Sequence, residues 1–141
     1  MKLFARYFFI IMVAVSIGTA DAHDADGGLP SWATSSNLWV VSCSDDGNGK
    51  PVNLEVSLLN NTANGPMVSL QVITVESKPR FFNIADAVGG DGLSTPQIST
   101  DWGGMHYILV NKSGYGEVGY HFTGHCMSVD DHTGTDIQQY R

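Results

Sequence analysis

Positive charge is scarce in this sequence. The chain of 141 residues has 7 lysines and arginines against 14 aspartates and glutamates, a net charge of −7 at pH 7. Charged residues of either sign make up 15% of the chain, where about a quarter is usual. Nucleic acids and anionic lipid surfaces are bound by clusters of lysine and arginine. The composition therefore argues against both kinds of partner.

The sequence also lacks an apolar run that could cross a membrane. The longest run covers residues 7–17, whereas a spanning helix needs about 20 apolar residues. A lysine and an arginine precede this run, and the small-residue motif Ala20-Asp21-Ala22 follows it. This order is typical of a secretory signal peptide. We expect residues 1–22 to be removed, with cleavage after Ala22 or Ala20, and the protein to be secreted or periplasmic without membrane insertion.

Removal of residues 1–22 takes away Lys2, Arg6 and Asp21. The remaining 119 residues then carry 5 basic and 13 acidic side chains, a net charge of −8. This length is enough for one domain with a core. Cleavage after Ala22 would make His23 the N-terminus.

Only two cysteines are present, Cys43 and Cys126. In an oxidising compartment two cysteines can form one intramolecular disulfide, and the alternative is a pair of free thiols. Each cysteine falls on the apolar face of an expected strand. We therefore expect one bridge that crosses a sandwich core.

No helical stripe follows the signal segment, whereas alternation of apolar and polar residues, which is typical of strands, recurs along the chain. The alternating runs are 38–43, 52–58, 67–75, 105–110 and 118–126. A shorter apolar run begins at Phe81 inside residues 76–104, which otherwise resemble a long loop. The pattern predicts an all-β fold: a single antiparallel β-sandwich of jelly-roll or immunoglobulin-like type over residues 38–141, stapled by the disulfide.

Residues 23–37 show no such period. They are polar and contain Gly27, Gly28 and Pro30. We expect an extended N-terminal arm. Such an arm can be a disordered leader, or it can pair with a sheet edge of its own domain or of a second copy, which makes a homo-oligomer possible.

The segments 104–110 and 119–122 (GMHYILV and GYHF), joined by a glycine-rich turn, resemble the closing hairpin of bacterial pre-peptidase C-terminal-type domains. In that family a strand with a Gly-x-Tyr-Tyr-like motif is followed by a turn and a second aromatic strand. The resemblance implies a secreted, jelly-roll-like β-sandwich that serves as a binding or secretion accessory, often beside an enzyme. We expect no enzyme domain beside it in this chain.

Histidine provides the first candidate ligands for a metal. His121 and His125 flank Gly124 in one expected strand and point to the same side, about 13 Å apart if the strand is regular. An N-terminal His23 can bind copper through its amine and imidazole, with other histidines as further ligands. The alternative is that the strand histidines face solvent and that His23 only follows the cleavage site.

Acidic clusters at 24–26, 45–48 and 130–131 offer oxygen ligands of the kind that calcium uses. None has the spacing of a twelve-residue calcium loop, and aspartate is common in turns without any metal. Copper and calcium therefore stay alternatives to a protein without a cofactor.

Three aromatic residues, Trp32, Trp102 and Tyr115, fall in the arm or in loops. Exposed aromatic rings can bind sugars or proteins, or they can cap the ends of a sandwich. The catalytic motifs G-x-S-x-G and H-E-x-x-H are absent. The sequence predicts a non-catalytic module that binds an extracellular protein or carbohydrate or takes part in a surface assembly. A small periplasmic copper-binding protein is the alternative.

Overall fold

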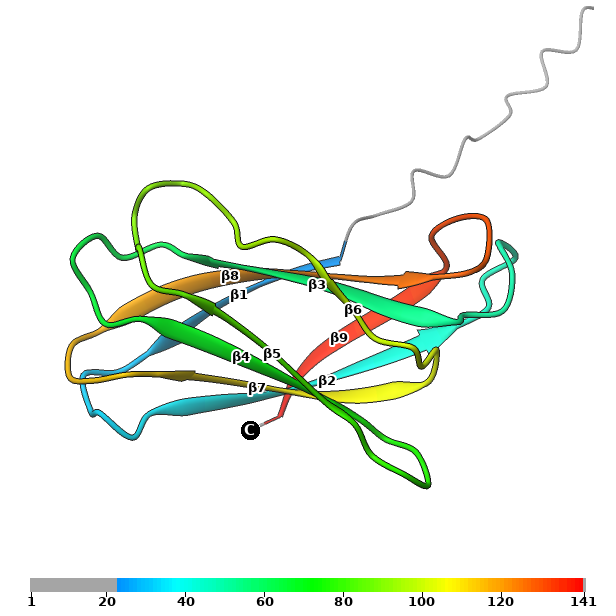
Figure 1. Cartoon of the computed structure of the whole chain (residues 1–141), viewed down its shortest axis with the longest axis horizontal. Helices are drawn as coiled ribbons and strands as arrows, with labels where there is room; N and C mark the ends of the chain where they lie inside the picture. The colour runs from blue at the N-terminus through cyan, green and yellow to red at the C-terminus, as the bar shows by residue number, and fades with distance from the viewer. Residues whose placement is uncertain (1–22, 141) are drawn as a thin grey trace, which may run out of the picture.

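The computed structural model describes residues 23–140, which form two facing antiparallel β-sheets and no helix (Figure 1). The predicted signal peptide lies outside the described residues. The strands are β1 (His23–Leu29), β2 (Ser36–Ser44), β3 (Asn53–Asn60), β4 (Val68–Thr74), β5 (Phe81–Asp86), β6 (Ile98–Ser99), β7 (Met105–Lys112), β8 (Val118–Met127) and β9 (Gly134–Tyr140). The predicted all-β sandwich is confirmed. In the described range no helix is long and apolar enough to span a bilayer.

Four nested strand pairs define the topology: β1 with β8, β2 with β7, β3 with β6, and β4 with β5. A long hairpin that rolls up across itself produces this nesting, which is the jelly-roll arrangement. The sheets have the orders β1-β8-β3-β6 and β5-β4-β7-β2-β9, so β9 extends the second sheet beyond β2. Of the two sandwich types expected, the jelly roll is the one observed.

The loops gather at the two ends of the sandwich (Figure 1). The end on the left of Figure 1 holds the loops after β1, β3, β5 and β7. The opposite end holds the loops after β2, β4, β6 and β8. Any surface made by loops must therefore combine segments from within one of these two sets.

The core follows the alternation of the sequence. Every second residue of β3, β4 and β8 is buried between the sheets. The fully buried side chains include Leu54, Val56, Leu58, Val68, Leu70, Val72 and Phe122. The faces predicted for these strands are thus confirmed.

A tyrosine and a tryptophan join the two sheets inside this core. The indole Nε1 of Trp39 on β2 donates to the hydroxyl of Tyr120 on β8 at 2.8 Å, and Asn37 Nδ2 donates to the same hydroxyl at 2.8 Å. Burial raises the pKa of Tyr120, although these two hydrogen bonds oppose the shift. Trp39 also meets the ring of Phe122 edge-on, with centroids 5.4 Å apart.

The disulfide joins Cys43 on β2 to Cys126 on β8, with 5.5 Å between the Cα atoms. These strands belong to different sheets, so the bridge crosses the sandwich as the parity of the two cysteines predicts. The linked strands are the second and the eighth of the nine strands in residues 23–140. They are not the first and the last, because β1 precedes the alternating runs found in the sequence and β9 follows them.

The segment expected as an arm contributes the preceding strand. Residues His23 to Leu29 are extended, but they form β1 and pair with β8 along their whole length. The sandwich therefore includes residues 23–29 and does not start at residue 38. In this position β1 covers the edge of β8, whose backbone groups would otherwise be unpaired. Of the alternatives left open for this segment, the structure shows pairing with its own domain.

Sequence analysis also missed β9 and resolved only part of residues 76–104. In β9 only Thr135 is buried, so the apolar alternation is weak there. Phe81–Asp86 forms β5, as the short apolar run indicates, and the two-residue β6 pairs with β3. The long loop of the prediction is thus interrupted by two short strands.

Candidate binding surface at one end of the sandwich

Two of the three aromatic candidates are in loops that meet at the left end of Figure 1. Trp32 is in the loop after β1 and Tyr115 is in the loop after β7. The amide of Gly116 donates to the carbonyl of Ser31 at 3.0 Å, which brings the two loops together one residue away from each ring. Trp32 is 68% exposed and Tyr115 is 82% exposed, so neither ring caps the core. We call this pair of loops the aromatic end.

A buried lysine contacts the backbone of both loops from the interior of the sandwich. Lys112 lies on the inward side of β7 and is buried. Its ammonium donates to the carbonyls of Pro30 and Gly116, one in each loop. Bonds of a charged donor to buried carbonyls are stronger than neutral ones. Lys112 therefore fixes the backbone that carries the two rings.

Sequence analysis did not identify Lys112 as a functional residue. Its position in the strand could have identified it as buried. Lys112 follows His106, Ile108 and Val110 at alternate positions of β7, all of which face inward. A lysine at an inward position needs acceptors, and backbone carbonyls of the neighbouring loops supply them.

A shallow hollow of about 530 Å³ adjoins the aromatic end. Gly28 and Gly119 are paired across β1 and β8, and they leave the outer surface of the sheet bare there. Pro30 and Thr62 border the hollow, and the Thr62 hydroxyl accepts a hydrogen bond from the amide of Gly119 at 2.9 Å. Glu117 supplies a carboxylate at the rim. The volume is in the range of small-molecule sites.

The third aromatic candidate, Trp102, lies at the opposite end and does not join this surface. Its ring packs on Gly104, where a Cβ would come within 2.5 Å of the indole Nε1. Trp102 also lines a hollow of about 440 Å³ with Lys50, Pro51 and Asp101. The ring is half-buried, in keeping with the capping alternative.

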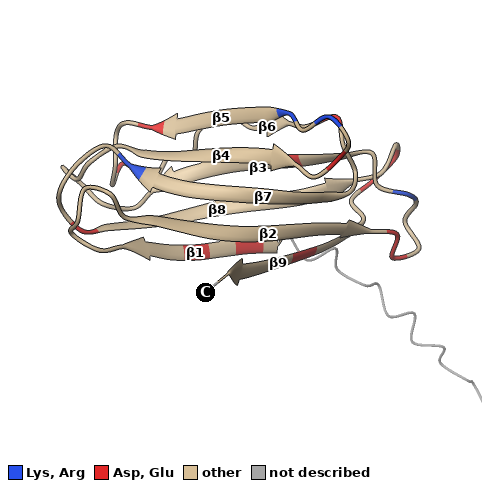
Figure 2. Cartoon of the chain, turned by 90° about the horizontal axis from the view of Figure 1, so that it is seen from below, with Lys and Arg blue, Asp and Glu red and all other residues tan. Residues whose placement is uncertain are grey.

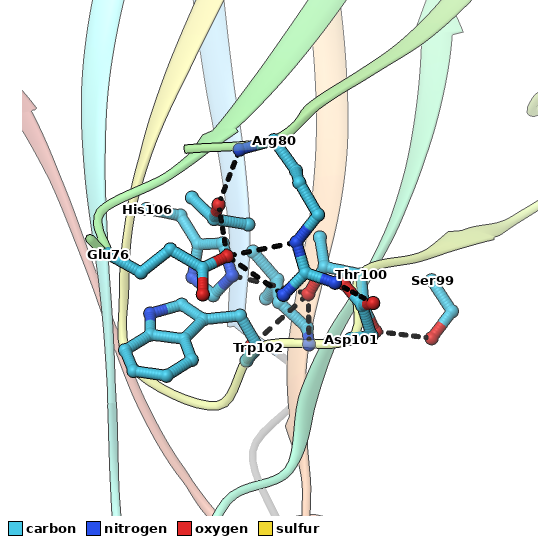
Figure 3. Close-up of polar contacts among 9 residues, drawn as sticks. Glu76, Arg80, Ser99, Thr100, Asp101, Trp102 and His106 are labelled. Atoms are coloured by element: carbon cyan, nitrogen blue, oxygen red, sulfur yellow. Dashed lines mark hydrogen bonds and ion pairs between the residues drawn. The ribbon is translucent and has the colours of Figure 1, made fainter. Parts of the chain in front are cut away.

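A polar network lies beside Trp102 (Figure 3). Arg80 donates from Nε and Nη2 to one oxygen of Glu76, at 3.0 and 2.8 Å, and also contacts Asp101. The hydrogen bonds from Arg80, followed by that from Thr74, hold the pKa of Glu76 below its usual value. The network ties the loop after β4 to the loop after β6.

His106 lies beneath this network with no exposed surface. Its Nε2 is 3.2 Å from the hydroxyl of Thr100, which also accepts a hydrogen bond from the amide of Leu54 at 2.9 Å. Burial lowers the pKa of His106 to about 4, so the ring is neutral at physiological pH. A buried neutral ring with these contacts anchors Thr100 between the sheets.

The histidines expected as metal candidates lie at the surface of the first sheet. His121 and His125 occupy outward positions of β8, as the strand parity predicts. His121 Nδ1 is 3.0 Å from Asp26, and its Nε2 is 3.8 Å from Asp24. The ring of His125 lies 4.5 Å from that of His132, and burial followed by the charge of His132 lowers the pKa of His125.

The third candidate, His23, pairs with Gly124 across β1 and β8, next to His125 in the chain. Among residues 23–140 no group of three histidine, cysteine, aspartate or glutamate side chains is placed to hold a metal ion. In two of the acidic clusters considered for calcium, carboxylate oxygens accept turn hydrogen bonds: Asp45 from Gly47, Asp46 from Asn48, and Asp131 from His132. Such contacts are typical of turn-forming aspartates.

No protein-family model, curated protein or solved structure matches this chain. The resemblance to pre-peptidase C-terminal-type domains therefore stays a prediction. The structure defines the class of the protein as a disulfide-linked jelly-roll sandwich with two exposed aromatic side chains on neighbouring loops at one end.

Proposed function

We propose that this protein is a secreted or periplasmic, non-catalytic module that binds an extracellular partner at the aromatic end. One observation supports this most directly: Trp32 and Tyr115 are exposed on loops that the same buried lysine holds. Mobile loops lose conformational entropy on binding, and loops fixed in advance lose less. The disulfide is compatible with an oxidising compartment outside the cytoplasm.

The chemistry of this end favours a neutral carbohydrate as the partner. Aromatic rings stack on the apolar faces of sugars, and tyrosine and tryptophan add a polar group at the edge. Lys112, the cation of this region, points inward, and Glu117 lines the adjacent hollow. These features and the net negative charge disfavour an anionic ligand.

A screen of the signal-cleaved protein against an array of neutral and acidic glycans tests the proposal. We expect retention by neutral glycans, and we expect Trp32→Ala and Tyr115→Ala each to weaken it at least tenfold, because each removes a stacking surface. Val129→Ala is the matched control, since Val129 is 82% exposed in a loop at the opposite end. Retention that neither aromatic variant changes would place binding elsewhere, and no retention of wild type would exclude carbohydrate.

Copper binding is the second candidate function. One observation favours it: the ring of His125 lies 4.5 Å from that of His132, and His23 is paired with the adjacent Gly124, although the three side chains do not form a ready-made metal-binding group. An amine at His23, created by signal cleavage, would add a nitrogen ligand there. Elemental analysis of naturally cleaved protein after dialysis tests this candidate. Stoichiometric copper that is lost in His125→Ala supports it, and protein without copper after incubation with the ion excludes it.

A further inference from the structure

The outer faces of the two sheets differ sharply in charge. The sheet of β1, β8, β3 and β6 presents Asp24, Asp26, Glu55, His121 and His125 at outward positions. On the sheet of β5, β4, β7, β2 and β9, all of which lies in the described range, Asp136 is the one charged side chain at an outward strand position. Figure 2 shows this second sheet from outside, and the ribbon over its middle is tan, the colour of residues other than Lys, Arg, Asp and Glu.

Apolar and aromatic side chains replace charge there. The strand registers align one row across four strands: Val40 is opposite Tyr107, Tyr107 is opposite Ile73, and Ile73 is opposite Phe81. A second row begins with Leu38 opposite Leu109. Phe81 is 68% exposed, and Tyr107 is 38% exposed on the central strand β7. We call these six residues the apolar face.

We propose that the apolar face is the interface of a homodimer, in which a second copy of this chain packs its own apolar face against it. This inference goes beyond the proposed function, because it concerns a different surface from the aromatic end.

Charge is the first argument for a second copy. The chain without its predicted signal peptide carries a net charge of −8, so two copies repel each other at most approaches. The apolar face is the broad sheet surface on which two copies can meet without bringing carboxylates together. A two-fold axis that lies in the interface plane, over the centre of β7, would place Tyr107 and Leu109 against the same residues of the partner copy, as a self-complementary interface requires.

Area is the second argument. The apolar face and the rim residues Gln71, Asn83, Gln138 and Tyr140 fill two side-chain rows across five strands. A third row across four strands completes the rim with Ser36, Asn111, Ser69 and Ala85. Strands lie about 4.8 Å apart and side-chain rows about 7 Å apart, so this patch covers roughly 500 Å². Two such patches bury about 1,000 Å² in total, which reaches the size of a specific interface. The mainly polar rim suits the border of such an interface.

The dimer does not need the N-terminal segment that sequence analysis considered for oligomer formation. That segment is β1, and its backbone is paired with β8 of the same chain. The two sheets thus have separate roles in this proposal: one exposes charge to solvent, and the other meets the second copy.

Sedimentation equilibrium over a concentration series tests the proposal with a matched pair of variants. Leu109→Glu places a carboxylate in the apolar face, and Leu59→Glu makes the same change at a half-buried outward position of β3 on the other sheet. We expect wild type and Leu59→Glu to dimerise with similar constants, and Leu109→Glu to lose at least a hundredfold in association. Higher salt should strengthen the wild-type dimer, since it screens the net repulsion.

Phe81→Glu is the second variant, in case Leu109→Glu does not fold. Phe81 is mostly exposed on the edge strand β5, so this change leaves the core intact, and we expect at least a tenfold loss of association. A wild type that stays monomeric at the highest concentration would overturn the proposal. So would a dimer that persists unchanged in both Leu109→Glu and Phe81→Glu. Loss of glycan binding leaves these outcomes unaffected, because Trp32 and Tyr115 lie outside the apolar face.

Discussion

Two polar side chains occupy inward positions at opposite ends of β7, His106 near one set of loops and Lys112 near the other. Each is buried and each finds partners in the loops of its own end. Buried polar side chains at the two ends of a strand can hold the adjoining loops through hydrogen bonds, without a larger apolar core. The loops at both ends of this small domain depend on such contacts.

The burial of His106 predicts a loss of stability in acid. In the unfolded chain its imidazole takes up a proton near the ordinary histidine pKa of 6.5, whereas in the folded protein the pKa of His106 is about 4. Between these values the unfolded state binds more protons, so the free energy of unfolding falls as the pH drops, by on the order of 3 kcal/mol in total.

Urea unfolding of wild type and His106→Gln from pH 7 to pH 4 measures this effect. We expect the variant to be less stable at pH 7 and to show a flatter dependence on pH. His125→Gln is the comparison, because the pKa of His125 is also lowered but its ring lies outside the core. If the free energy of unfolding of His106→Gln depends on pH as steeply as that of wild type, the acid sensitivity belongs to other groups.

The contacts of Lys112 predict that Lys112→Met loosens the aromatic end. The substitution keeps the length of the side chain but leaves the carbonyls of Pro30 and Gly116 without their donor. We expect a loss of about 1–3 kcal/mol in stability and faster amide exchange in both loops. Lys50→Met, at an exposed position of the opposite end, is the control. Unchanged exchange in the loops would show that they are held without the lysine.

At the scale of the secondary-structure element, the position of β1 depends on a single glycine, Gly27. It crosses over the buried Tyr120, and a Cβ at Gly27 would lie 2.2 Å from the ring and hydroxyl of that tyrosine. Only glycine allows this close approach. The neighbouring Gly28 has open space, with its nearest atom, the carbonyl oxygen of Val118, 3.8 Å away.

Gly27→Ala and Gly28→Ala therefore form a matched pair. We expect Gly27→Ala to cost about 2 kcal/mol or more, because either β1 or Tyr120 must move, and Gly28→Ala to change stability by less than about 0.5 kcal/mol. Thermal unfolding of both variants provides the measurement. Equal stabilities would indicate that β1 is not bound to β8 in solution.

The same strand shows where sequence analysis reaches its limit. β2, β3, β4, β7 and β8 were predicted because apolar residues recur at alternate positions over most of their length. β1 has only Ala25 and Leu29 buried among polar residues and glycines, so no local period marks it. Its pairing depends on a strand at the other end of the chain. A window of neighbouring residues does not contain that information.

At the scale of the whole molecule, the surfaces were harder to predict than the fold. The parity of Cys43 and Cys126 was sufficient to predict a disulfide across the core. Trp32 and Tyr115 were identified singly, and only the jelly-roll topology places their loops together. The apolar face was not recognised at all, since its six residues come from four strands and no strand contributes more than two of them.

The nested pairing of β1 with β8 also determines when the fold can be completed. Within residues 23–140 the first strand pairs only with β8, almost a whole chain away, so it stays single until the eighth strand is available. Local hairpins such as β4–β5 can close early, whereas the outermost pair must wait, and chains rich in such distant pairs fold slowly. If the chain crosses a membrane from its N-terminus onward, β1 emerges early and stays unpaired until β8 has also crossed. During that time the edge of β1 is open to chaperones or to the wrong strand.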